Sequence, residues 1–158
     1  MPLELDLSSP VLAIVSAAAL GFAVGFVPIG LAEVLAVTIG AVTPPELALG
    51  MLAAFTVAHV FAKVGWYWLG TFADRVRHRR IKTVIDQAKA LMATRPAYST
   101  VLLGSAALAS VPPFHLAAIA AGVARYPLGA FLAVCITGRA LRFAALASVP
   151  ALLRAMLN

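Results

Sequence analysis

The chemistry open to this chain rests on a few ionisable side chains inside long apolar stretches. Glu33 lies five residues after Pro28, and Arg139 and Arg142 lie one helical turn apart in a later stretch. Placing such a group within a bilayer costs roughly 2.5–3.5 kcal/mol, so its presence suggests a function. The Glu33 carboxyl must be protonated or paired, and the guanidinium groups need an anion, carbonyl oxygens or water. These residues are our first candidates for binding an anionic substrate.

Three further titratable groups lie in the same apolar stretches. Lys63 stands five residues before Trp68, and it either binds substrate or extends to the membrane interface. His59 and His115 are each either a hydrogen-bonded interior residue or part of a proton relay. A structural alternative exists for the first candidates too, with Glu33 as a neutral carboxyl bonded to broken backbone and the arginines as a structural pair. We include all of these residues in the candidate substrate site and leave those alternatives open.

Other kinds of site are not predicted. The single cysteine, Cys135, excludes an intrachain disulfide and any cysteine-based metal site. No cluster of histidine, cysteine and aspartate has the spacing of metal ligands, and no nucleophile-and-base arrangement or phosphate-binding loop is present. We therefore expect no metal, no cofactor and no enzymatic activity.

The composition indicates the solvent of the folded chain. Hydrophobic residues make up 63% of the 158 residues and charged residues 11%, whereas soluble domains carry about 25% charged residues. So few charges cannot cover a water-exposed surface of this size, so the lipid bilayer is the expected solvent. We expect an all-α integral membrane protein with a single membrane domain over residues 1–158.

The first proline break separates an apolar run at 11–27 from another at 31–42, with Pro28 and Gly30 between them. As helices these runs are about 25 Å and about 18 Å long, and a hydrocarbon core is roughly 30 Å thick. Broken backbone at membrane depth is tolerated only where protein or a wet cavity covers it. The pattern predicts a re-entrant hairpin that enters and leaves the membrane on one side.

The second break lies at Pro112 and Pro113, between apolar runs at 98–110 and 116–123. These runs are also short, and they predict a second re-entrant hairpin. The alternative is a single kinked span over 98–122, which is long enough to cross a membrane. That alternative would move the C-terminus to the cytoplasmic side.

Two longer apolar runs, 45–69 and 127–149, predict helices that span the membrane. The first ends in the aromatic residues Trp66–Trp68, which are typical of a membrane interface. The second begins at a proline and should stop near Pro150, because proline usually ends a helix.

Seven of the twelve Lys and Arg residues lie between Arg75 and Arg95. Apolar residues recur there every three or four positions, which predicts a basic amphipathic helix over 74–95 lying on a membrane surface. A solvated linker helix is the alternative. Because the segment flanks apolar spans, we expect anionic lipid and not nucleic acid as its partner. The cations expected at the surface are Arg75, Arg77, Arg79, Arg80, Lys82 and Lys89.

Residues 11–70 and 97–150 read as two repeats, each a hairpin followed by a span. If both hairpins return to the side they start from, eight cations lie on the face of the basic segment and one, Arg154, on the face of the termini. The positive-inside rule then places the basic segment in the cytoplasm and the termini across a multi-pass inner (plasma) membrane. The hairpins enter from opposite sides, an inverted repeat of the kind that builds transporters.

The order of these motifs resembles the DedA/VTT-domain membrane proteins, also called SNARE-associated Golgi proteins. That family is described by two facing re-entrant hairpins and is linked to lipid scrambling or flipping, including that of polyprenyl-phosphate carriers. The chain resembles small bacterial members, although Lys63 stands where many members carry aspartate. The matching segments are Pro28–Glu33, Lys63–Gly70, Ser110–Pro113, Ala121–Gly122 and Gly138–Phe143.

These features favour a membrane lipid transporter, a flippase or scramblase for anionic phospholipid or polyprenyl-phosphate headgroups. In this hypothesis Arg139 and Arg142 attract the phosphate and Glu33 competes for them, so we expect Glu33 to face at least one of the arginines. The alternatives are a proton-coupled transporter of a small solute and a membrane scaffold without transport activity. A homo-oligomer is compatible with each hypothesis.

Overall fold

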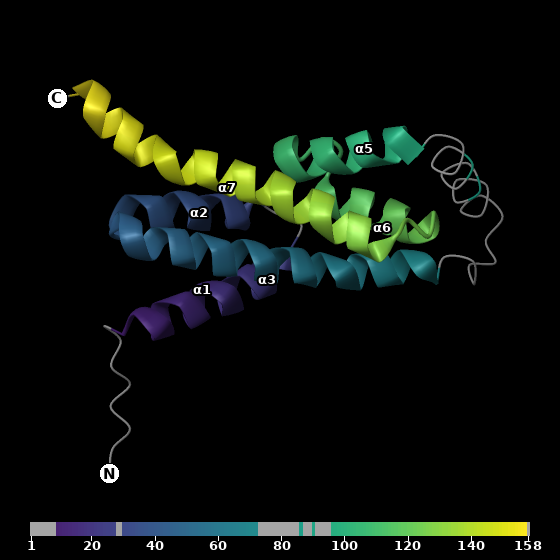
Figure 1. Cartoon of the computed structure of the whole chain (residues 1–158), viewed down its shortest axis with the longest axis horizontal. Coiled ribbons are helices and arrows are strands. Elements are labelled where there is room, and N and C mark those ends of the chain that lie inside the picture. Colours follow the sequence, from purple (N-terminus) through teal and green to yellow (C-terminus); the bar gives the residue numbers. More distant parts are fainter. Residues whose placement is uncertain (1–8, 28–29, 73–85, 87–89, 91–95, 158) are drawn as a thin grey trace, which may run out of the picture. The chain divides into compact units, whose positions relative to one another are not determined.

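The apolar runs between the prolines fold into helices (Figure 1). The computed structural model describes residues 9–27, 30–72, 86, 90 and 96–157, and within them it contains six α-helices and no β-strand. The all-helical prediction is therefore confirmed. Pro28 and the six cations expected at the membrane surface lie outside the described residues. The helices are α1 Pro10–Gly25, α2 Leu31–Val42, α3 Pro45–Thr71, α5 Pro96–Ala109, α6 Phe114–Val123 and α7 Leu128–Leu157.

Two of these helices are long and apolar enough to cross a membrane, as predicted. They are α3 with 27 residues and α7 with 30 residues. The other four have 10 to 16 residues, which is too short to cross a hydrocarbon core of roughly 30 Å.

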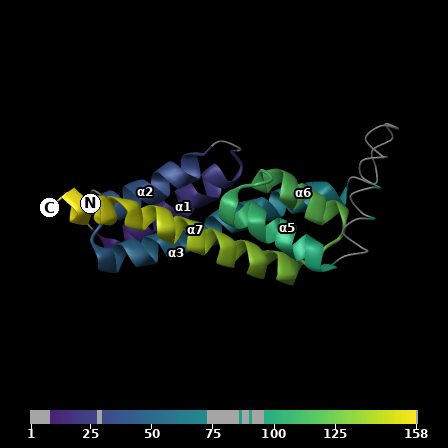
Figure 2. The ribbon, with the colours of Figure 1, turned by 90° about the horizontal axis from the view of Figure 1, so that it is seen from above.

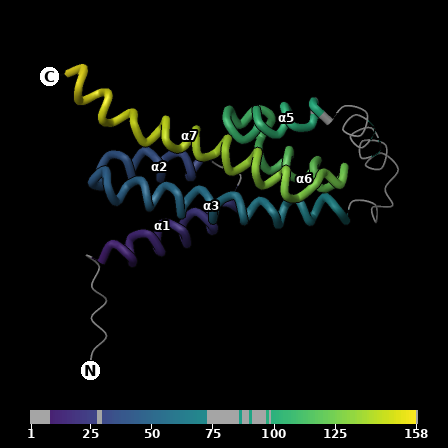
Figure 3. The backbone as a smooth tube through the Cα atoms, in the orientation of Figure 1, coloured from purple at the N-terminus to yellow at the C-terminus, as the bar shows by residue number. Residues whose placement is uncertain are grey.

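The prediction that the last helix stops near Pro150 is wrong. α7 continues past this proline to Leu157, and Figure 3 shows it as one unbroken coil. The proline removes one backbone hydrogen bond, but the alanine and leucine residues beyond it are strong helix formers. Arg154 also holds the end of α7, because its Nη2 donates to the Ala41 carbonyl oxygen at the end of α2, 2.8 Å away.

The chain divides into two compact units. Unit 1 comprises Met1–His59 with Phe143–Asn158, and unit 2 comprises Val60–Arg142. Unit 1 therefore contains α1, α2, the first part of α3 and the last part of α7. Unit 2 contains α5, α6 and the remaining parts of α3 and α7.

In unit 1 the helices approach closely at two glycines. A Cβ atom at Gly21 of α1 would meet the backbone of Phe55 in α3, and one at Gly40 of α2 would meet the backbone of Ala147 in α7. Glycine allows this close helix packing. Phe55 and Phe143 fill the core beside these crossings, with their ring centroids 5.2 Å apart.

Unit 2 repeats the scheme. A Cβ atom at Gly122 of α6 would meet the backbone of Tyr67 in α3, and one at Gly138 of α7 would meet Ala107 of α5. Here α5 and α6 pack against each other and lie side by side (Figure 2). In each of the two predicted repeats, 11–70 and 97–150, the first short helix (α1 or α5) thus packs on the long helix of the same repeat. The second short helix (α2 or α6) packs on the long helix of the other repeat.

Candidate functional site

Two cationic side chains lie at the ring of Phe114 in unit 2. The Cζ atom of Arg139 is 4.5 Å from the ring centroid, and the Nζ atom of Lys63 is 5.7 Å from it. Only 4% of Arg139 and 3% of Lys63 are exposed. Attraction between a cation and the face of an aromatic ring offsets part of the desolvation cost. The structure therefore gathers two like charges in its interior at a single ring.

Three helices position these side chains. Lys63 lies on α3 and Arg139 on α7, and Phe114 is the first residue of α6, directly after the N-cap Pro113. Proline has no N–H and disfavours a helical residue before it, so the Pro112–Pro113 pair ends α5 and starts α6 anew. The predicted break at these prolines is confirmed, and it places an aromatic ring against both cations.

Ser110, at the end of α5, is a hydrogen-bond partner of Arg139. The Arg139 Nη2 donates to the Ser110 Oγ over a long 3.4 Å. The backbone of Ser110 has a φ of 59°, a left-handed conformation that costs a residue other than glycine about 1–2 kcal/mol. Backbone strain of this kind clusters at functional sites, which supports this end of α5 as part of one.

Arg142 has a structural contact of its own. Its Nη1 donates to the carbonyl oxygen of Leu108, 2.8 Å away, in the last turn of α5. A cation at this position satisfies an end carbonyl and interacts favourably with the negative end of the helix dipole. The predicted role of Arg142 in substrate binding stays a prediction.

Unit 2 is positively charged in its described part. Its only described carboxylate is that of Asp86, which is exposed. The N-terminus of α6 has no side-chain cap and adds the positive end of its dipole beside Phe114. Such a charge distribution attracts anions. The described cations of this unit are Lys63, Arg125, Arg139 and Arg142.

The candidates Glu33 and His59 belong to unit 1. Glu33 lies in the first turn of α2, where the positive end of the helix dipole favours a carboxylate. His59 is buried against aromatic rings, with centroids 6.1 Å from that of Phe55 and 5.5 Å from that of Phe143. The predicted contact between Glu33 and an arginine joins residues of different units, and it stays a prediction.

His115 and Trp66 contact each other in unit 2, next in sequence or helical position to the residues at the Phe114 ring. Their ring centroids are 5.8 Å apart, and His115 directly follows Phe114. His115 was a predicted candidate, whereas the sequence analysis placed Trp66 at a membrane interface and did not identify Trp66 or Phe114 as site components. Two signals in the sequence point to these residues. Trp66 lies three positions after Lys63, which places both on one helix face, and Phe114 comes immediately after the prolines.

Comparison with known protein families, curated proteins and solved structures finds no match to this chain. The resemblance to the DedA/VTT-domain proteins therefore stays a prediction.

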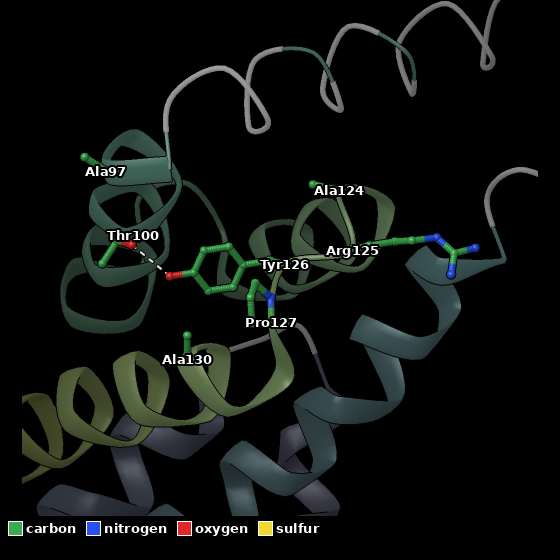
Figure 4. Close-up of a pocket in the computed structure, with 7 residues that line it drawn as sticks. All are labelled: Ala97, Thr100, Ala124, Arg125, Tyr126, Pro127 and Ala130. Atoms are coloured by element: carbon green, nitrogen blue, oxygen red, sulfur yellow. Dashed lines mark hydrogen bonds between the residues drawn. The ribbon is translucent and has the colours of Figure 1, made fainter.

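A second candidate is a cavity of about 430 Å³ at the turn between α6 and α7 (Figure 4). The hydroxyls of Thr100 and Tyr126 are hydrogen-bonded across it at 2.8 Å. Arg125 also lines it, in a left-handed conformation with a φ of 51°, but its side chain points away from the hydroxyl pair. This cavity combines two hydroxyls and apolar walls with one cation at its edge, whereas two buried cations meet at Phe114, so the Phe114 site is the stronger candidate for binding an anion.

Proposed function

We propose that this chain is an integral membrane protein that moves anionic lipid headgroups across a bilayer, as a flippase or scramblase for phospholipid or polyprenyl phosphate. The observation that carries the proposal is the burial of Lys63 and Arg139 at the ring of Phe114. A phosphate would be attracted by both cations, and the planar guanidinium can bind two of its oxygens at once.

The exposed surface supports a lipid environment. Large apolar side chains point outward from the long helices, among them Leu49 and Phe61 on α3 and Leu141 on α7. Apolar exposure on this scale is unfavourable in water and natural against hydrocarbon chains. Together with the lengths of α3 and α7, this supports a membrane protein with two spanning helices.

The short helices support the re-entrant part of the proposal. α5 and α6 fold back against each other (Figure 2), which favours a hairpin over one kinked span. The recurring pairing of short and long helices in units 1 and 2 is what an inverted repeat predicts. In the proposed topology, the segment 74–95 lies at the cytoplasmic face of an inner membrane and the termini lie on the opposite face.

The proposal is tested by transport in proteoliposomes. Purified protein is reconstituted with fluorescent phosphatidylglycerol, and the fraction of label reaching the other leaflet is followed by chemical quenching from outside. We expect Arg139→Gln and Lys63→Gln each to slow transport at least tenfold, because each change removes a buried cation. Arg154→Gln, which changes an exposed arginine in the last turn of α7, should transport at the wild-type rate.

Two results would contradict the proposal. One is wild-type protein that moves no more lipid than empty vesicles. The other is transport that survives both site substitutions unchanged. Transport of a small solute that depends on a pH gradient, without lipid movement, would favour the proton-coupled alternative.

A further inference from the structure

The indole Nε1 of Trp66 is buried without a hydrogen-bond partner among the described residues. An indole N–H is only a donor, and buried polar atoms in folded proteins are nearly all hydrogen-bonded. A buried donor without an acceptor is therefore a place where a ligand oxygen would bind favourably.

Trp66 is linked to the two buried cations along α3 and through His115. It lies one helical turn after Lys63 on α3, on the same helix face. Its ring lies against His115, at an angle of 53° and with the centroids 5.8 Å apart. His115 directly follows Phe114, whose ring carries the two cations.

We propose that the Trp66 N–H donates a hydrogen bond to an oxygen of the anion that Lys63 and Arg139 attract. Donors from α3 and α7 then converge on one ligand. A tetrahedral phosphate offers oxygens in several directions, whereas a carboxylate has two oxygens in one plane, so the donor set suits phosphate. This inference rests on the proposed function, and it adds Trp66 as a residue that selects phosphate, either free or on a lipid.

The test uses the full chain purified in detergent, with three probes. These are dihexanoyl phosphatidic acid, inorganic phosphate, and dihexanoylglycerol, which lacks the phosphate. Trp66→Phe keeps an aromatic ring and removes the N–H, and we expect it to weaken binding of phosphatidic acid about tenfold or more. The matched control is Trp68→Phe, two residues further on the same helix, where the side chain is 51% exposed; its affinity should equal that of wild type.

Fluorescence gives a second readout, because the chain has only two tryptophans. In the Trp68→Phe protein all tryptophan emission comes from Trp66, and we expect phosphatidic acid to change it while dihexanoylglycerol does not. This readout decides the question if Trp66→Phe does not fold. Inorganic phosphate that competes at similar concentration would identify free phosphate as sufficient, and its failure to compete would identify the lipid as the source.

The outcomes separate the two proposals. If wild type binds phosphatidic acid and Trp66→Phe binds it equally well, the role of Trp66 is wrong and the proposed function stands. An unchanged Trp66 emission during such binding would likewise show that the proposed role of Trp66 is wrong. If wild type binds neither phosphate probe, the proposed function itself fails.

Discussion

Arg139 lies over the ring of Phe114, with its guanidinium carbon 4.5 Å from the ring centroid, and both side chains are buried. Lys63 approaches the same ring to 5.7 Å. In an interior where few polar groups are available, the ring face supplies part of the stabilisation that water would otherwise give. Phe114 is therefore a contact of both cations as well as a core residue.

A double-mutant cycle measures this contact. We expect Phe114→Leu and Arg139→Gln to show a coupling energy of about 1 kcal/mol in the free energy of unfolding, within the usual range for cation–π pairs. The cycle of Phe114→Leu with Lys63→Gln should give a smaller coupling, because Lys63 is farther from the ring. If Phe114→Leu changes the free energy of unfolding equally in the presence and absence of Arg139, the contact contributes nothing to stability.

The crossing of α3 and α6 gives a prediction about stability. Gly122→Ala would place a Cβ atom against the Tyr67 carbonyl, so we expect the free energy of unfolding to fall by about 2–3 kcal/mol through overpacking. Gly129→Ala is the control, because nothing lies within 4 Å of its added Cβ. Gly129 is the second residue of α7, where helix propensity counts for less than in a helix interior, so this change should stabilise by at most about 0.5 kcal/mol. Thermal unfolding in detergent measures both, and a tolerated Gly122→Ala would refute the close crossing.

Arg142 is predicted to stabilise the end of α5. Removing its hydrogen bond to the Leu108 carbonyl with Arg142→Gln should lower the free energy of unfolding by about 1–2 kcal/mol. Arg154→Gln removes a bond of the same length to Ala41 at a more exposed position, so its effect should be smaller. Chemical denaturation compares the two. If Arg142 also binds substrate, Arg142→Lys will restore part of the stability without restoring the affinity for phosphatidic acid.

Tyr67 is predicted to stabilise the turn between α6 and α7. Its hydroxyl donates to the Tyr126 carbonyl oxygen at 2.7 Å, and Tyr67 is buried. Tyr67→Phe should therefore lower the free energy of unfolding by about 1–2 kcal/mol, because the carbonyl loses its donor. Tyr126→Phe removes only the exposed bond to Thr100 and should have less effect. Similar losses in the two variants, measured by thermal unfolding, would contradict this assignment.

The all-helical class, the number of long apolar helices and the breaks between the short ones could be predicted from the sequence. These features are local. The length of a helix follows from the length of its apolar run. A proline removes a backbone hydrogen-bond donor whatever the tertiary structure around it. The exception is Pro150, where the prediction ended α7 too early. The strong helix formers after that proline and a hydrogen bond from Arg154 to Ala41, more than a hundred residues away in sequence, continue the helix beyond it.

The composition of the site was decided by the tertiary structure. Helical spacing paired Arg139 with Arg142, but the first lies at the Phe114 ring and the second donates to the end of α5. Lys63 joins Arg139 only because α3, α6 and α7 bring distant segments together. Spacing along one helix shows which side chains share a face. It does not show which other helix covers that face, because the packing of glycines such as Gly122 against a neighbouring backbone sets that contact.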